Sequence, residues 1–534
     1  MARYAFDRLT ALDNSFLALE NHNAYMHVAS TMTFDAGPLR HADGGIDAEA
    51  LKQLIAGCLP MIPRYRQRLA WTPLYRNPVW IDDDRFSIDF HVRHTSLPRP
   101  GDARQLKRLS ARIMEHHLDR RRPLWEMWLV EGLEDDRLAM ISKVHHCMID
   151  GVSGVDIMRV LMSPREDQRI VEAPPFVPRP APSGVELMVR EGFRWASAPV
   201  RALRGVGHAI SEARDVRRQM VTAARGLATT LGGSLRPPSS TPINGEIGPH
   251  RRFDWITMNL SDIKSIRKLL GGSLNDVVLT IVTGAIRRLL IRRQVRPENI
   301  HFRVMAPVSV RAAAEQGALG NRVSAWIIEL PIAEMDPRRQ LAAITRRTHE
   351  LKDAKDAVGA EMLTSAAEWT PTTLLSLAGR NVSRLLPFNM VVTNVPGPQF
   401  PMYMLGARMQ ECFPHVPLFE SLGLGIALMS YDGKLCWGFN ADYDLVPDLH
   451  PFVDDVESAF AELVNIARAN VEITPQAVER AENSAPAGDA AAAEKPADSD
   501  AATPEQTGGK AARGAGGAVV EIASAGSGSD SAKG

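Results

Sequence analysis

Two adjacent histidines, His145 and His146, end an apolar strand-like run, and Asp150 and Gly151 follow within the next five residues. Asp-Gly is a turn signal, and functional side chains are commonly presented where a strand passes into a loop. A neutral imidazole, with an ordinary pKa of about 6.5, can accept a proton from a bound hydroxyl group at physiological pH. The spacing therefore predicts a histidine general base, with a purely structural histidine pair as the alternative.

Two other chemistries are less compatible with this stretch. Side chains alternate along a strand, so His145 and His146 should lie on opposite faces, and no third ligand follows at helical spacing. We therefore predict no metal. Cys147 raises the alternative of a cysteine–histidine nucleophile pair, but a regular strand would direct Cys147 away from His146. No serine elbow of the GxSxG type is present around the histidines.

The elements that must position the histidines alternate between strands and helices. We expect a strand over 27–36, a helix over 47–69 that is bent near Pro60 and Pro63, and a helix over 102–118 capped by Asp102. The runs 124–133 and 137–146 predict a hairpin, because only the polar residues 134–136 separate them. A further helix is expected over 154–162, directly after the Asp-Gly turn.

A second body with similar patterning follows later in the chain. Strands are expected over 253–260, 301–311, 324–331 and 390–398, and helices over 261–270, 337–355 and 452–471. The segment 274–293 is apolar on several sides, which predicts a buried helix. Asp432-Gly433 within 424–442 predicts a tight hairpin turn.

Composition excludes several classes of protein. The 534 residues carry 62 Lys and Arg and 62 Asp and Glu. The chain therefore has no overall surplus of basic residues that would point to nucleic acid as a partner. The four cysteines are far apart in sequence, which predicts reduced thiols in the cytoplasm. We recognise neither a signal peptide nor an apolar run of the ~20 residues that a membrane span needs. Any membrane contact should therefore be peripheral.

These patterns predict an α/β protein with four segments: an N-terminal domain over 1–165, a linker over 166–249, a C-terminal domain over 250–472 and a disordered tail over 473–534. The linker begins proline-rich and continues as a basic amphipathic stretch that contains Trp195 and several arginines. Such a stretch can lie in a membrane interface, and a helical crossover with a solvated arginine face is the alternative.

Six motifs, in order, carry a resemblance to a known family. The segments are LDRRRPLWEMWLVEGL (118–133), HHCMIDG (145–151), SLNDVVLTIVTGAIRRLL (273–290), APVSVR (306–311), GNRVSAWIIELP (320–331) and MVVTNVPGP (390–398). HHCMIDG fits the HHxxxDG signature of acyltransferases built like chloramphenicol acetyltransferase and of condensation domains. The full set resembles the bacterial wax ester synthase/diacylglycerol acyltransferase family over about residues 8–470.

The resemblance implies two chloramphenicol-acetyltransferase-like domains with mixed sheets and an active site at their interface. It implies transfer of an acyl group from acyl-CoA to diacylglycerol or a fatty alcohol, without a cofactor. His146 would be the general base and His145 a supporting residue. Asp150 would orient the loop, with Arg311 as a candidate partner, and Gly151 would permit the turn and close approach of the backbone.

The resemblance also implies substrate-binding roles outside the histidine motif. Asn275 would face the histidine across the interface, with helix capping as the alternative for Asn275 and Asp276. Pro123, Leu124 and Trp125 are expected to line the acyl or alcohol channel, although packing alone would also explain the leucine and the tryptophan. A loop near the site is expected to be shaped by Asn394, Pro396 and Gly397.

The implied substrates are insoluble lipids, so we expect a cytoplasmic enzyme that associates peripherally with a membrane or a lipid droplet. Two other functions stay open. One is a condensation-like enzyme that uses carrier-protein thioesters, although the chain contains no obvious carrier module. The other is a non-catalytic lipid-binding protein. The preferred acceptor, the acyl length and the oligomeric state do not follow from the sequence.

Overall fold

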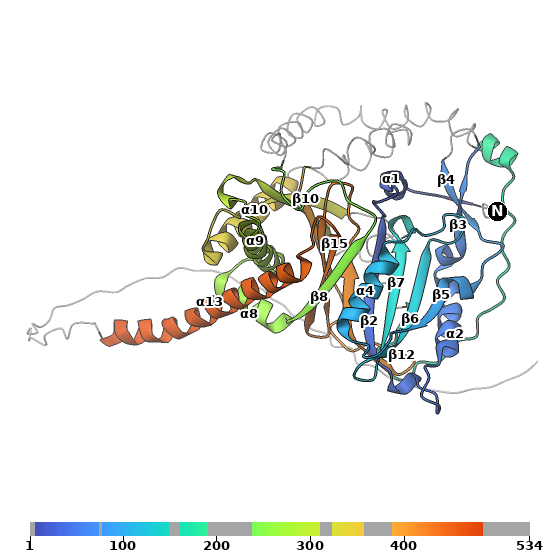
Figure 1. The fold of residues 1–534 in the computed structure, drawn as a ribbon, viewed down its shortest axis with the longest axis horizontal. Coiled ribbons are helices and arrows are strands. Elements are labelled where there is room, and N and C mark those ends of the chain that lie inside the picture. Colours follow the sequence, from blue (N-terminus) through green and yellow to red (C-terminus); the bar gives the residue numbers. More distant parts are fainter. Residues whose placement is uncertain are drawn as a thin grey trace, which may run out of the picture. The chain divides into compact units, whose positions relative to one another are not determined.

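Two six-stranded mixed sheets and one three-stranded sheet form the β-structure of the described residues (Figure 1). The structure is a computed structural model that describes residues 6–73, 77–148, 160–190, 238–309, 323–356 and 387–483. All three sheets lie within a compact unit formed by residues 1–476.

The first six-stranded sheet carries the histidine motif on one of its central strands. Its order is β12-β13-β2-β7-β6-β5, in which β5 and β6 are parallel and the other pairs antiparallel. The predicted hairpin is confirmed, since β6 and β7 are antiparallel neighbours. The strands are β2 (His27–Asp35), β5 (Val92–Ser96), β6 (Trp125–Leu133), β7 (Arg137–His145), β12 (Tyr403–Met404) and β13 (Ala407–His415).

Strand β13 joins the two halves of the chain. It lies in the range expected for the C-terminal domain, yet it pairs with β2 of the first sheet, with Cys412 opposite Met32. This pairing was not predicted, because no local sequence signal reports a partner strand so far away. The four predicted domain ranges stay predictions.

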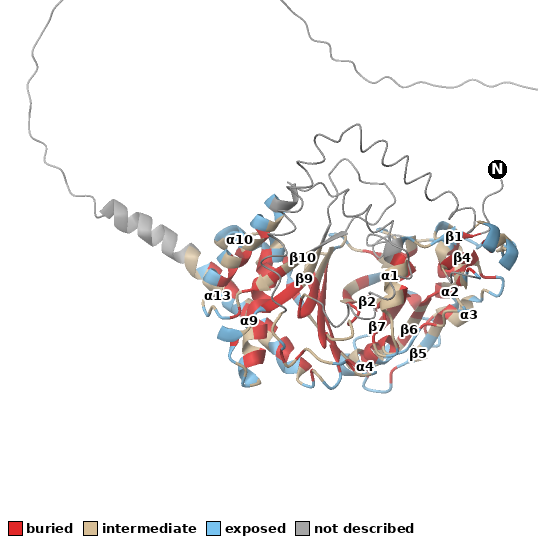
Figure 2. Cartoon of the chain, turned by 90° about the horizontal axis from the view of Figure 1, so that it is seen from above, coloured by how far each residue is buried: buried red, intermediate tan, exposed pale blue. Residues whose placement is uncertain are grey.

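Helices cover both faces of the first sheet, as the buried residues on each side show (Figure 2). Helix α4 (Ala103–Met114) begins at the predicted cap Asp102, whose side chain accepts from Gln105 N at 2.8 Å. On the opposite face, α2 (Ala48–Cys58) ends before Pro60, and 3₁₀ turns follow at Leu59–Met61 and Pro63–Arg66. The predicted helix was too long, since residues 67–71 form a strand instead.

That strand belongs to the small sheet, whose order is β1-β4-β3. Its members are β1 (Asp7–Arg8), β3 (Gln67–Trp71) and β4 (Pro78–Asp82). Helix α1 (Ala11–Leu19) follows β1 and has a capping box between Thr10 and Asp13. A short helix, α3 (Ile88–His91), leads into β5. Helix α1 contacts the turn that follows β7 and so reaches the histidine motif.

The second six-stranded sheet has the order β10-β9-β11-β14-β15-β8, with β11 parallel to both neighbours. The predicted Asp432-Gly433 hairpin turn is confirmed, with φ of 43° and 78°, as a type I′ turn requires. The strands are β8 (Arg251–Asn259), β9 (Phe302–Ser309), β10 (Val323–Leu330), β11 (Met390–Pro396), β14 (Leu424–Tyr431) and β15 (Lys434–Asp442).

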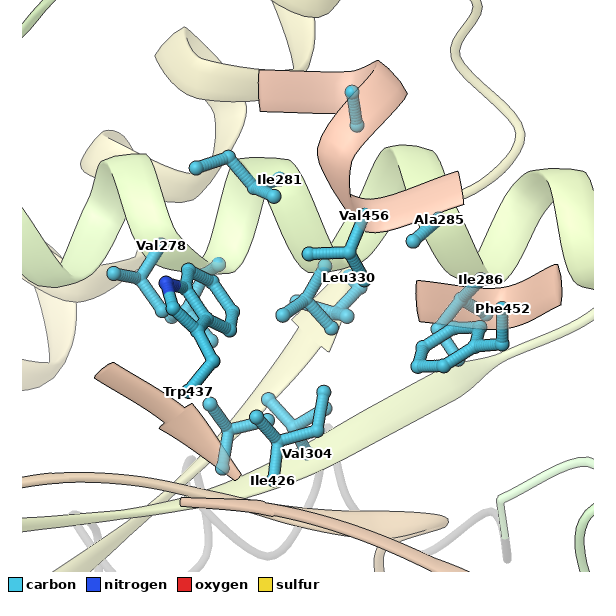
Figure 3. Packing of buried hydrophobic residues seen from close by; sticks show 14 of the residues in the cluster. Val278, Ile281, Ala285, Ile286, Val304, Leu330, Ile426, Trp437, Phe452 and Val456 are labelled. Atoms are coloured by element: carbon cyan, nitrogen blue, oxygen red, sulfur yellow. The ribbon is translucent and has the colours of Figure 1, made fainter. Parts of the chain in front are cut away.

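One apolar core joins this sheet to its helices. Val278, Ile281 and Ile286 of α9 (Leu274–Arg292) pack with Trp437 and with residues of α13 (Leu449–Asn483), as Figure 3 shows. The prediction of a buried helix over 274–293 is thus confirmed. Helices α8 (Leu260–Leu270) and α10 (Pro337–Asp356) pack against α9.

No single helix of the described residues is both long and apolar enough to cross a membrane. Helices α8 and α9 together meet that length and composition, but they are bent by 97° and α9 is largely buried in the core. Several predictions fall outside the described residues: most of the helix over 154–162, nearly all of the basic part of the linker, and the tail beyond residue 483. Residues 473–483, which were predicted as the start of the disordered tail, are helical and form the end of α13. The proline-rich start of the linker is described and has no regular secondary structure.

Candidate active site

The two motif histidines separate where β7 ends. His145 is the last residue of the strand, and its backbone N–H donates to the carbonyl of Leu124 at 2.9 Å. His146 begins a 3₁₀ turn, His146–Met148, and its backbone N–H donates to the carbonyl of Met26 at 2.8 Å. The change from strand to turn gives the two imidazoles different surroundings.

His145 is buried and has a defined tautomer. Its Nδ1 accepts a hydrogen bond from the backbone N–H of Cys147 at 3.1 Å, so the ring proton of the neutral form lies on Nε2. Nε2 then donates to Oε2 of Glu20 at 3.3 Å. His145 is therefore held from both ring nitrogens and is poorly placed to act as a base.

Glu20, the C-cap residue of α1, is a buried anionic centre that was not predicted from the sequence. Its carboxylate contacts Nη2 of Arg120 at 2.6 Å, Nε2 of His27 at 3.4 Å and Nδ1 of His117 at 3.5 Å. Burial raises the pKa of Glu20, but hydrogen bonds with His117, His145 and His27 outweigh burial and hold the pKa well below its ordinary value. Residues 11–20 carry no predicted element, and no motif there singles out Glu20.

His146 lies against α1 rather than beside Glu20. Its ring stacks on Phe16 with centroids 3.9 Å apart and an interplanar angle of 17°. Burial, together with the nearby His145, lowers the pKa of His146 to about 4, against an opposing contact with its own backbone. Nδ1 of His146 is buried without a hydrogen bond to any described residue. The ring is thus neutral at physiological pH and, unlike His145, is not engaged at both nitrogens by protein groups of the described chain.

The alternative nucleophile, Cys147, is buried next to the histidines. Burial, with smaller contributions from Asp13 and Glu20, raises the pKa of the Cys147 thiol well above its ordinary value. A thiol in such surroundings is a poor nucleophile, because the thiolate is the reactive form. Among the described residues, no group of three or more His, Cys, Asp or Glu side chains is arranged to hold a metal ion.

The segment Pro123–Leu124–Trp125 touches the motif through its backbone, at the Leu124 carbonyl that accepts from His145. Leu124 and Trp125 are fully buried. The Trp125 indole stacks on His91 at 4.5 Å and donates from Nε1 to the carbonyl of Tyr65 at 2.8 Å. These contacts anchor the segment in the core, and its role as a channel lining stays a prediction.

Asn275 and Asn394 are brought together, since Asn394 Nδ2 donates to Asn275 Oδ1 at 2.8 Å. Asp276 closes a capping box with Ser273 at the start of α9 and accepts from Thr348 Oγ1 at 2.9 Å. Capping is therefore observed for Asp276. None of these side chains hydrogen-bonds to His145 or His146, and their substrate contacts stay predictions.

Pro396 ends β11, and Gly397 lies close to β14. Gly397 N–H donates to Ser430 Oγ at 3.3 Å, and a Cβ atom at position 397 would lie only 2.4 Å from the carbonyl oxygen of Ser430. Glycine is required by this close approach. Asp150, Gly151 and Arg311 lie outside the described residues, so the expected ion pair and turn stay predictions.

Comparison with known families identifies both halves of the chain. Residues 9–278 match the wax ester synthase/diacylglycerol acyltransferase catalytic domain, and residues 319–464 match the WS/DGAT C-terminal domain. A Mycobacterium tuberculosis protein named diacylglycerol O-acyltransferase is 31% identical over 86% of this chain and 90% of its own length. A Mycobacterium bovis relative with the same assigned name is also 31% identical, over 86% of this chain and 96% of its own length.

Solved structures confirm the predicted fold class. The wax ester synthase/diacylglycerol acyltransferase of Marinobacter aquaeolei VT8 superposes with a TM-score of 0.63 at 24% identity, covering 86% of this chain and 99% of that chain. The first condensation domain of the calcium-dependent antibiotic synthetase superposes with a TM-score of 0.54 at 16% identity, covering 86% and 96%. The chain is thus an α/β protein with mixed sheets and belongs to the wax ester synthase/diacylglycerol acyltransferase family of acyltransferases.

Proposed function

We propose that the protein transfers an acyl group directly from acyl-CoA to the hydroxyl of diacylglycerol or a long-chain alcohol, with His146 as general base. The observation that carries this proposal is the contrast between the two histidines. His145 is held at both ring nitrogens by Cys147 and Glu20, whereas His146 is neutral and stacked on Phe16. Only the second ring is left to accept a proton.

The proposed reaction is a single displacement. The acceptor hydroxyl oxygen forms a bond to the thioester carbonyl carbon while its proton passes to the His146 imidazole. The carbon–sulfur bond then breaks, and His146 returns the proton to the departing sulfur, so that CoA leaves as the thiol. General-base catalysis of this kind typically contributes about 10²–10⁴-fold. No acyl-enzyme forms, and no cofactor is needed.

The products would be triacylglycerol or wax esters, depending on the acceptor. Both acceptors are insoluble, and we propose that a cytoplasmic enzyme meets them at a membrane or lipid-droplet surface through peripheral contact. The family assignment supports an acyl donor and a lipid acceptor. Channel shape decides between acceptors, and one methylene is worth only about 1–3 kcal/mol of discrimination.

The test is CoA release from palmitoyl-CoA in detergent micelles, with hexadecanol or dioleoylglycerol as the acceptor. We expect acceptor-dependent release by the wild type, and the ratio of rates to identify the preferred lipid. If neither acceptor supports release, the lipid assignment is wrong, and a carrier-protein thioester becomes the donor to examine. Release of CoA by the wild type at a rate that does not depend on the lipid acceptor would equally contradict the proposal.

A further inference from the structure

The loop between α1 and β2, residues 21–26, lies between the groups that hold the two histidines. Glu20, immediately before it, contacts His145, and Met26, at its end, accepts the backbone N–H of His146 at 2.8 Å. His27 follows and lies 3.4 Å from Glu20. A displacement of this loop would therefore move contacts of both histidines.

Hydrogen bonds between its own residues stabilise the loop. Asn21 Oδ1 accepts the backbone N–H groups of Asn23 at 2.9 Å and Ala24 at 2.7 Å, and Asn21 N–H donates to the Ala24 carbonyl at 3.1 Å. Ala24 and Met26 are fully buried in a cluster with Ile247 and Leu418, which come from later parts of the chain. The loop therefore transmits a displacement at its tip instead of absorbing it.

Arg251, the first residue of β8, holds the tip of this loop. Its guanidinium is almost fully buried, and Nη2 donates to the backbone carbonyl of Asn23. Nη1 donates to the carbonyls of Gly248 at 2.7 Å and His250 at 3.0 Å. The same group lies 5.2 Å from the centre of the Tyr25 ring, a distance at which a cation is attracted to an aromatic face.

Two further bonds join the loop to the same segment. Asn23 Nδ2 donates to the Ile247 carbonyl at 2.9 Å, and the Tyr25 hydroxyl donates to the Pro249 carbonyl at 3.5 Å. Residues 247–251 thus contact the loop through both its backbone and its side chains. Arg251 makes the contact that is charged, and a hydrogen bond from a charged donor is stronger than one from a neutral donor.

We propose that Arg251 is a positioning residue for acyl transfer, which couples β8 of the second sheet to the histidines of the first. Arg251 holds Asn23, and the loop in turn presents the Met26 carbonyl to His146 and the Glu20 carboxylate to His145. This inference rests on the proposed role of His146. Misplacement of a catalytic group by ~1 Å can cost about a hundredfold in rate, so a remote contact of this kind can control kcat.

The fold should survive loss of the guanidinium. Asp442, which pairs with Arg251 across the sheet at 3.6 Å, also accepts the backbone N–H groups of Gly248, Asp444 and Leu445 at 2.8, 3.1 and 2.9 Å. Its carboxylate therefore keeps three donors in Arg251→Met. Methionine retains most of the apolar stem, so the variant removes the hydrogen bonds with little loss of packing.

The matched control is Arg252→Met. Arg252 is the next residue along β8, but its side chain donates to the Tyr443 carbonyl at 3.1 Å and stacks on the Tyr443 ring at 3.8 Å. Those contacts stay within the second half of the chain. Both variants lose one arginine from the same strand, so they match in charge and differ in contact with the loop.

The experiment compares Arg251→Met, Arg252→Met, Asn23→Ala and His146→Ala in the full chain. It measures kcat and KM for palmitoyl-CoA with the preferred acceptor, thermal unfolding, and hydrogen–deuterium exchange of the segments 20–27 and 143–148. We expect Arg251→Met to lower kcat by about tenfold or more with KM within about twofold, because misplacement affects the transition state and not uniform binding. Exchange should rise in both segments, while Arg252→Met matches the wild type.

Asn23→Ala removes only the side-chain bond to Ile247, and we expect a smaller fall in kcat with the same pattern of exchange. This variant and Arg251→Lys carry the test if Arg251→Met does not fold. The inference would be overturned if folded Arg251→Met and Asn23→Ala had the kcat of the wild type. It would also be overturned if exchange became faster in 20–27 but stayed unchanged in 143–148. An active His146→Ala would instead overturn the proposed function, so the two failures are distinguishable.

Discussion

Phe16 stacks on His146 with ring centroids 3.9 Å apart, and it lies one helical turn before Glu20, which holds His145. One helix end thus supports both histidines. We expect Phe16→Leu to lower kcat and to raise the pKa of His146 from about 4 towards its ordinary value, because burial is the main cause of the low value. The measurement is the acid limb of the kcat/KM profile, which should move to higher pH.

Phe90→Leu is the control for that change. Phe90 lies beside Arg93 and Arg122 and makes its ring contact with His91 instead of His146. The acid limb of the kcat/KM profile of Phe90→Leu should coincide with that of the wild type. An unchanged acid limb in Phe16→Leu would show that the stacked ring does not set the protonation of His146.

Removal of the Glu20 carboxylate should affect stability and activity differently in two variants. Glu20→Ala leaves the buried Nε2–H of His145 without its acceptor, and an unsatisfied buried group costs about 1–3 kcal/mol. Arg120 is partly exposed and keeps the Leu17 carbonyl as an acceptor at 3.3 Å. Glu20→Gln keeps an acceptor for His145 but removes the charge. We expect Glu20→Ala to unfold at a lower temperature and to lose activity, and Glu20→Gln to keep more of both. Equal, wild-type behaviour of the two variants would contradict the role of Glu20.

As the pH is lowered, the protein should begin to lose stability at pH values well above the ordinary pKa of carboxylates. Burial lowers the pKa of four histidines: His27 and His415 to about 3, and His91 and His146 to about 4. The unfolded chain binds protons at these residues below about pH 6.5, whereas the folded protein does not until its lower values are reached. Stability contributed by the neutral rings is therefore present above pH 6.5 and is lost as the pH falls towards 4.

Thermal unfolding at pH 7.5, 6 and 5 checks this expectation. The unfolding temperature should fall between pH 6 and pH 5, and His41→Gln should show the same dependence because His41 is exposed. Glu20, whose pKa is lowered, adds a further loss only below about pH 4.5. A constant unfolding temperature from pH 7.5 to pH 5 would mean that these rings are not buried as neutral groups.

Cys147 should be dispensable for chemistry. Burial raises the pKa of its thiol, so Cys147→Ala should keep kcat within a few-fold of the wild type, and iodoacetamide should not inactivate the folded enzyme. Mass spectrometry of the treated protein checks whether the thiol has reacted. A folded Cys147→Ala variant as inactive as His146→Ala would favour covalent catalysis by cysteine.

Elements with local signals were predictable from the sequence. Asp102 marks the start of α4, Asp432-Gly433 marks the β14–β15 turn, and the largely apolar segment 274–293 marks the buried helix α9. In each case the signal and the structure it specifies lie within a few residues of one another. The histidine strand was predicted for the same reason.

Contacts between distant segments were not predictable. Nothing in residues 407–415 indicates that they pair with β2, and residues 67–69 were predicted as the end of a helix although they belong to β3, which pairs with β4. Glu20 was missed because its contacts with His145, His117 and Arg120 arise only when α1, β7 and the segment that follows α4 meet. Its carboxylate has no local pattern that distinguishes it from a surface residue.

The most direct test of the central claim is a single-turnover measurement of acyl transfer from palmitoyl-CoA to the preferred acceptor by wild type and His146→Ala. Both proteins are measured at saturating substrate, and thermal unfolding checks that the variant is folded under the same conditions. If His146 is the base, the rate constant of the variant falls by at least about a hundredfold. A folded His146→Ala variant that transfers the acyl group at the wild-type rate would contradict the account and leave both histidines with structural roles.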